Sequence, residues 1–120
     1  MTGAATLPYD GRHLIADLNG CSGLTDERLI ASALTEAAAA AGATVLEIRL
    51  HSFGPGQGVT GVALLAESHI SIHTWPERDF AAVDIFMCGG CNPYHSLPVL
   101  KEVFAPTSIL LSEQRRGLIP

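Results

Sequence analysis

The middle of the chain reads Glu67-Ser68-His69-Ile70-Ser71-Ile72-His73-Thr74-Trp75-Pro76-Glu77. Because side chains alternate between the two faces of a strand, Ile70 and Ile72 point one way while His69, Ser71 and His73 point the other. The stretch therefore predicts a strand with one apolar face and one face that carries two imidazoles and a hydroxyl. A solvated polar face is the ordinary alternative, so the neighbouring segments are needed to interpret it.

Patterns on both sides of this stretch predict the remaining elements. Apolar residues recur every three or four positions after Thr25, a plausible N-cap, and Gly42 is the expected stop of this helix. Pro93 and Ser96 open a second, shorter helix. The order predicts an α+β fold, most simply a two-layer α/β sandwich whose antiparallel sheet carries both helices on one face. The other expected strands are 13–18, 45–53, 59–66, 81–87 and 108–111.

Length and charge narrow the class of protein. A chain of 120 residues fits a single domain, 1–120. Its net charge of −5 argues against nucleic acid, whose binding depends on neutralising phosphates with Lys and Arg. No apolar run reaches the roughly 18 residues that span a bilayer, so no membrane partner is expected. Three cysteines, and a start at residues 1–7 that is neither basic nor strongly apolar, predict a cytoplasmic protein with reduced thiols.

Cys88 ends the strand that follows the central stretch. If the two strands pair as a hairpin, its thiol comes near the imidazoles of the polar face. A thiol beside a histidine can serve as a metal ligand, a nucleophile or a proton donor, because the neighbour tunes the thiol pKa. A lone buried cysteine is also a common apolar filler.

Several motifs resemble those of one known family. They are the central stretch 67–77, Gly58-Val59-Thr60-Gly61-Val62 and Ala81-Ala82-Val83-Asp84-Ile85-Phe86-Met87-Cys88-Gly89. The likeness extends upstream through Gly11-Arg12-His13-Leu14 and His51-Ser52-Phe53. Together they resemble the short, prokaryotic type of S-adenosylmethionine decarboxylase over most of residues 11–117. The central block is long and unusual, so chance agreement is improbable.

This resemblance implies a proenzyme that cleaves itself and works with a pyruvoyl group. Ser68 would attack the carbonyl of Glu67, and the residue matching His73 would act as the proton acceptor in processing. The products would be a β chain, 1–67, and an α chain, 68–120, that begins with the pyruvoyl group made from Ser68. Cys88 matches the proton donor in decarboxylation, and Thr60 matches a processing hydroxyl that is usually serine, so cleavage is expected to be slower here.

The resemblance also implies a substrate, a product and a partner. Glu77 would bind the ribose hydroxyls of S-adenosylmethionine, and Phe53 would stack on its adenine, the alternative being a core phenylalanine at a strand end. The products would be decarboxylated S-adenosylmethionine, which supplies aminopropyl groups for spermidine, and CO2. No metal ligand is expected. Two protomers would pair their sheet faces in an αββα arrangement, giving a heterotetramer of two α and two β chains.

The sequence leaves three alternatives open. Relatives with the same pyruvoyl chemistry decarboxylate ornithine or arginine, and the loop from Pro55 to Gly58 is one residue longer than the usual family loop, beside the expected pocket. The spacing of Cys88, Cys91 and His95 resembles half of a zinc site or a dithiol redox centre. A family member that no longer reacts and only binds a partner is the third alternative, but it would have little reason to retain all of the reactive residues.

Overall fold

A computed structural model describes residues 8–118. The stretch 1–7, on which the expected cytoplasmic location partly rests, lies outside the described residues. In this range a single sheet is formed in the order β2-β3-β4-β5-β1-β6, and every neighbouring pair of strands is antiparallel. The elements are β1 (Tyr9–Asn19), α1 (Glu27–Ala40), β2 (Val45–Ser52), β3 (Val59–Leu65), β4 (Ser68–Trp75), the 3-10 turn η1 (Pro76–Arg78), β5 (Phe80–Cys88), the 3-10 turn η2 (Pro93–Ser96), α2 (Leu97–Phe104) and β6 (Ser108–Leu118).

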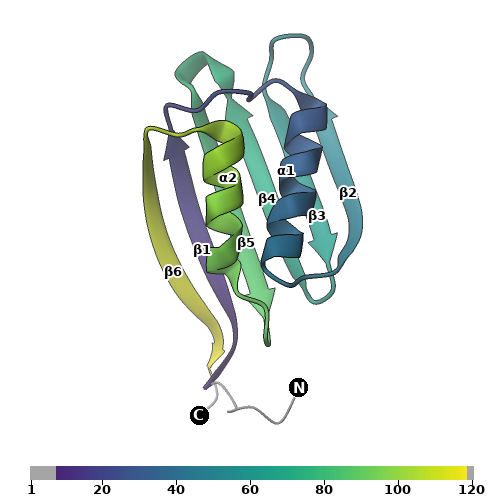
Figure 1. The fold of residues 1–120 in the computed structure, drawn as a ribbon, viewed down its shortest axis with the longest axis vertical. Helices are drawn as coiled ribbons and strands as arrows, with labels where there is room; N and C mark the ends of the chain where they lie inside the picture. Colours follow the sequence, from purple (N-terminus) through teal and green to yellow (C-terminus); the bar gives the residue numbers. More distant parts are fainter. Residues whose placement is uncertain (1–7, 119–120) are drawn as a thin grey trace.

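Both helices lie on one face of this sheet (Figure 1), which confirms the predicted α+β sandwich. Alternate residues of the strands point under the helices and are buried, as Leu14, Ile72 and Ile85 show. The helices contribute Leu34 and Phe104 to the same core. No element of the described residues covers the opposite face, which we call the open face of the sheet.

Helix α1 begins one residue later than the sequence pattern predicts. Asp26, and not Thr25, is the N-cap, and its carboxylate oxygen accepts a hydrogen bond from the backbone N–H of Leu29 (3.1 Å). Both residue types are good caps, so local propensity does not separate them. The helix ends in front of Gly42, as predicted.

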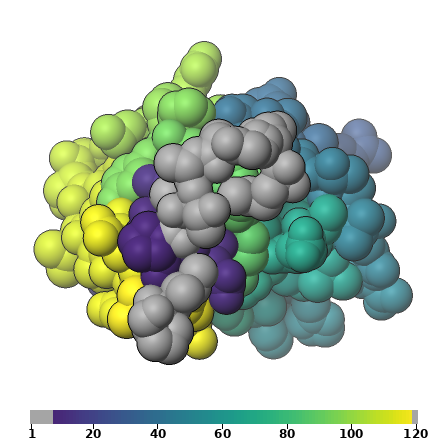
Figure 2. Space-filling view, turned by 90° about the horizontal axis from the view of Figure 1, so that it is seen from below, coloured from purple at the N-terminus to yellow at the C-terminus, as the bar shows by residue number. Residues whose placement is uncertain are grey.

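Three strands differ from their sequence patterns. Strand β1 begins at Tyr9 and not at residue 13. The alternation of 45–53 predicts Leu46 on the buried face, but a bulge between Val45 and Glu47 turns Leu46 outward, and 67% of it is exposed. The last strand runs to Leu118 and does not stop at residue 111, because it pairs with the whole of β1. Figure 2 shows the start of β1 (purple) beside the end of β6 (yellow).

No helix of residues 8–118 is long and apolar enough to cross a membrane.

Candidate active site

The hairpin that joins β3 to β4 brings three predicted site residues together. Leu65 and Ser68 pair across it, which leaves Ala66 and Glu67 as its two-residue turn. The backbone N–H of Cys88 donates to Ser68 Oγ (3.2 Å), and Cys88 Sγ donates to the carbonyl oxygen of Glu67 (3.2 Å). We call Glu67, Ser68 and Cys88 the Ser68 cluster. It joins a hydroxyl, a thiol and a peptide carbonyl at the end of two paired strands.

The backbone of Glu67 is strained at this turn. Its φ of +59° lies in the left-handed region, which costs a residue with a side chain about 1–2 kcal/mol. Tight two-residue hairpins demand positive φ and usually place glycine or asparagine there. The strain therefore falls on the residue whose carbonyl contacts the thiol of Cys88.

The thiol of Cys88 is held in its protonated form. Burial raises its pKa above the ordinary thiol value, and the negative charges of Glu67 and Asp10 raise it further, while a hydrogen bond to Ser68 opposes them. A neutral thiol can donate a proton, whereas a thiolate would act as a nucleophile. The environment therefore favours the role of proton donor.

A second group of predicted residues lies at the far end of β4. Thr60 and His73 face each other in the β3–β4 register, and Thr60 Oγ1 is hydrogen-bonded to His73 Nδ1 (3.1 Å). They line a pocket of about 360 Å³ together with Phe53 and Glu77. We call Thr60 and His73 the His73 cluster. Phe53 is 63% exposed, so its ring is not part of the core.

The two clusters are far apart within one protomer. Ser68 begins β4 and His73 lies five residues further along it, which at about 3.3 Å per residue is about 17 Å. In Figure 1 the β3–β4 hairpin and the loop between β2 and β3 lie at opposite ends of the sheet. The sequence predicted the thiol of Cys88 near the imidazoles of His69 and His73. The register places Phe86 opposite His69, so Cys88 is a diagonal neighbour of His69, but it places Ala82 opposite His73. Cys88 therefore lies with Ser68 and away from His73.

Sequence reasoning did not name Trp75 as a pocket residue, and it placed the loop that contains Gln57 beside the pocket without assigning that residue to the lining. Trp75 lies on the same face of β4 as His73, so the alternation of the strand could have identified it. Gln57 lies in the loop before β3, where no periodicity applies. Its place in the pocket follows only from the folding of the loop over the end of β4.

Comparison with known proteins identifies the family. The profile described as S-adenosylmethionine decarboxylase matches residues 12–117. The chain belongs to this family.

Individual relatives agree with the family profile. A protein of Methanococcus maripaludis is 45% identical over 91% of this chain and 91% of its own length, and one of Thermomicrobium roseum is 43% identical over 91% and 95%; both are named S-adenosylmethionine decarboxylase proenzyme. A crystal structure of the adenosylmethionine decarboxylase from Aquifex aeolicus has a TM-score of 0.84 at 34% identity, covering 95% of this chain and 96% of that one. The match spans nearly whole proteins, so the fold and the family are shared along the chain.

Cys88, Cys91 and His95 do not form the zinc or redox site that their spacing in the sequence suggests. Each of the three side chains has a different hydrogen-bond partner in this S-adenosylmethionine decarboxylase fold. Cys91 Sγ donates to the carbonyl oxygen of Gly42 (3.4 Å), while Cys88 Sγ donates to that of Glu67. His95 Nε2 is joined to the side chain of Asn92 (3.2 Å). Within residues 8–118, no group of three His, Cys, Asp or Glu side chains could hold a metal ion.

The open face of the sheet carries a pair of histidines, His13 and His69. The rings of His13 and His69 lie 6.0 Å apart, and each ring also lies about 6 Å from the ring of Phe86. Burial lowers the pKa of His69, the neighbouring His13 lowers it further, and Asp84 opposes both. His13 Nε2 is buried without a hydrogen-bond partner among the described residues. The lowered pKa therefore favours the neutral form of the His69 imidazole.

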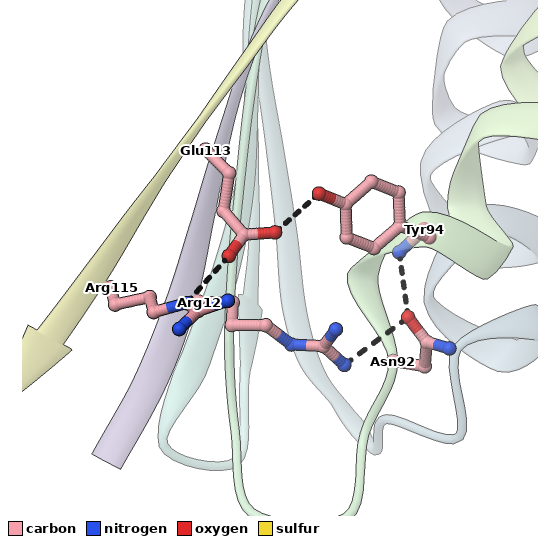
Figure 3. Close-up of polar contacts among 5 residues, drawn as sticks. All are labelled: Arg12, Asn92, Tyr94, Glu113 and Arg115. Carbon is pink, nitrogen blue, oxygen red and sulfur yellow. Dashed lines mark hydrogen bonds and ion pairs between the residues drawn. The ribbon is translucent and has the colours of Figure 1, made fainter. Parts of the chain in front are cut away.

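A polar network fixes the segment that follows Cys88 (Figure 3). Arg12 on β1 donates to the side-chain oxygen of Asn92 (3.3 Å), which also accepts from the backbone N–H of Tyr94 (3.0 Å). The hydroxyl of Tyr94 donates to Glu113 on β6, and Arg115 donates to the same carboxylate (3.1 Å). The bond to Glu113 raises the pKa of Tyr94 and lowers that of Glu113. The network ties η2 to the two strands beside it.

Proposed function

We propose that this chain is a self-processing, pyruvoyl-dependent decarboxylase that converts S-adenosylmethionine to decarboxylated S-adenosylmethionine and CO2. The observation that carries the proposal is the Ser68 cluster, in which a serine hydroxyl, the preceding peptide carbonyl and a protonated thiol lie together. The family and the names of the relatives supply the reaction and the substrate. The product would donate aminopropyl groups to spermidine in the cytoplasm.

Self-processing begins at the peptide bond between Glu67 and Ser68. Ser68 Oγ attacks the carbonyl carbon of Glu67, the C–N bond breaks, and an ester replaces the amide. Removal of the Cα proton of Ser68 by a base then expels the Glu67 carboxylate, and the remaining dehydroalanine hydrolyses with loss of ammonia. Two observations support this site: the strained φ of Glu67, which favours cleavage, and the contact of its carbonyl oxygen with a thiol donor.

The residues that surround Ser68 fit the chemistry of a pyruvoyl group. Formed from Ser68, the group would supply a carbonyl able to condense with the substrate amine and to accept the electrons released as CO2 leaves. Cys88 then returns a proton to the substrate Cα, for which its raised pKa is suited, because the thiol must be neutral when it acts. Positioned proton donors of this kind typically contribute about 10²- to 10⁴-fold to the rate.

The active site is completed by a second copy of the chain. A base must lie within about 3 Å of the proton it removes, and His73 of the same protomer is about 17 Å from Ser68 along β4. A two-fold axis that pairs two open faces can place the Ser68 cluster of one protomer against the His73 cluster of its partner, twice per dimer. Exposed apolar side chains on that face support the pairing: Ile15 is 40%, Leu64 45% and Leu110 71% exposed. The resulting assembly would be the αββα dimer, which after cleavage is a heterotetramer of two α and two β chains.

The substrate would lie in the pocket of the His73 cluster. The exposed ring of Phe53 offers a stacking surface for adenine, and the carboxylate of Glu77 offers paired acceptors for the two ribose hydroxyls. The reacting end of the substrate would then reach Ser68 and Cys88 of the partner protomer. Each complete site therefore takes its binding residues from one chain and its reactive residues from the other.

A denaturing mass spectrum tests the proposal. The purified protein is incubated with S-adenosylmethionine, ornithine and arginine together, and cyanoborohydride is added to reduce any covalent link to a substrate amine. We expect two fragments split after Glu67 and an adduct of S-adenosylmethionine on the fragment that begins at residue 68. An adduct of ornithine or arginine would assign a different substrate, and an uncleaved chain without adduct would refute the proposal. Ser68→Ala is the control that must remain uncleaved.

A further inference from the structure

Gln57, which lines the pocket, is the last residue of a tight four-residue turn. Its backbone N–H donates to the carbonyl oxygen of Gly54 (3.0 Å), which closes a four-residue turn with Pro55 second and Gly56 third. Gly56 has a φ of +71°, and this combination defines a type II turn. Proline fixes one angle of the turn and glycine permits the other, so the turn has little freedom.

The residue after Gln57 is clamped to β4. A Cβ atom at Gly58 would lie 2.3 Å from the carbonyl oxygen of Thr74, so the two backbones touch. The buried hydroxyl of Thr74 accepts from the backbone N–H of Val59 (2.8 Å) and donates to the carbonyl oxygen of Leu24 (2.8 Å). Gln57 is therefore held between the turn on one side and this clamp on the other.

The chemistry of the pocket suggests what the exposed carboxamide of Gln57 recognises. Phe53 presents an exposed ring whose neighbour His51 packs against it edge to face, at 4.8 Å between centroids. Because Phe53 and Gln57 line the same pocket, the polar edge of a flat heterocycle stacked on that ring would lie within reach of the carboxamide. A carboxamide carries one donor group and one acceptor group side by side, and that pair matches the 6-amino group and the adjacent ring nitrogen of adenine.

We propose that Gln57 is a specificity-determining residue that hydrogen-bonds the amino-substituted edge of the adenine stacked on Phe53, so that the loop selects adenosyl substrates. This inference rests on the proposed function, because it places the adenosyl group in this pocket. The carboxamide oxygen accepts from the 6-amino group and its N–H donates to the ring nitrogen. Gln57 contributes to binding the nucleoside and takes no part in the bond-breaking steps.

Nucleoside binding tests the inference without catalysis. Trp75 is the only tryptophan in the chain and lines the pocket, so its fluorescence reports occupancy. The full-length protein is titrated with 5′-methylthioadenosine and with the analogue that lacks the 6-amino group. We expect the wild type to prefer the adenosine compound by roughly fivefold, the effect of one hydrogen bond, and Gln57→Leu to bind both equally. Pro55→Ala is the matched control, since it loosens the same turn, keeps the carboxamide and leaves the preference in place.

Each outcome has a distinct meaning. A preference that persists in Gln57→Leu, or that is absent from the wild type while both nucleosides bind, overturns the role of Gln57 and leaves the proposed function intact. If the wild type binds neither nucleoside, both are overturned. Steady-state kinetics add a second readout: Gln57→Leu should raise KM for S-adenosylmethionine severalfold and leave kcat nearly unchanged, because the contact is the same in the ground and transition states.

Discussion

Two inactive variants, Ser68→Ala and His73→Ala, should restore one working site when both chains occur in the same dimer. The reason is the separation of about 17 Å between these residues along β4, which prevents a single chain from bringing them into contact. In a mixed dimer, Ser68 of the His73→Ala chain faces the intact His73 of the Ser68→Ala chain. The opposite site of that dimer lacks both groups.

The size of the effect follows from random pairing. Equal co-expression places about half of each variant in mixed dimers, and each mixed dimer has one complete site out of two. We therefore expect about half of the His73→Ala chains to be cleaved after Glu67, none of the Ser68→Ala chains, and about one quarter of wild-type decarboxylation. Different affinity tags on the two chains allow mass spectrometry to assign each fragment and to verify that mixed dimers have formed.

The control replaces the Ser68→Ala chain by a chain that carries both substitutions. It forms the same mixed dimers but supplies no histidine, so neither chain should be cleaved. Cleavage of His73→Ala chains when expressed alone, or equally in this control, would refute the need for a histidine from the partner. Verified mixed dimers without any cleavage would refute the proposed pairing of the two clusters.

Three further predictions concern the thiols and the core. The pKa of the Cys88 thiol is raised, and the protonated thiol is the form that donates the proton. We therefore expect kcat to fall only at pH values above the ordinary thiol pKa of about 8.5. A fall in kcat at lower pH would contradict the role of Cys88 as proton donor. Cys88→Ser should lower kcat by at least about 10²-fold and remove this alkaline limb, whereas Cys91→Ser should leave kcat nearly unchanged; equal losses in rate assays would favour a joint role of the thiols. Ser96→Ala removes a buried hydrogen bond of 2.7 Å to the carbonyl oxygen of Ala37 and should lower the free energy of unfolding by about 1–2 kcal/mol in urea titrations, with exposed Ser32→Ala as an unaffected control.

Most of the fold was predictable because its signals are local. The alternation of Ile70 and Ile72 with polar residues assigned β4 and its two faces, and the residues after Thr25 assigned α1, since these periods are properties of the backbone alone. The predictions were wrong where the pairing with another strand determines the local structure. Leu46 is turned outward by a bulge defined only in the pairing with β3, and residues 112–118 are a strand only because β1 lies beside them.

The site divides in the same way. The sequence predicted Ser68, His73 and Cys88 as reactive groups from motifs that resemble those of the family, without reference to distance. Their grouping required the tertiary structure. The strand register places Cys88 beside Ser68 and places His73 at the opposite end of the sheet. The eight residues of β4 alone do not indicate which residues of the neighbouring strands each of them contacts. Proximity in a sheet is set by the pairing of distant segments under one packed core, and that pairing exists only once the chain has folded.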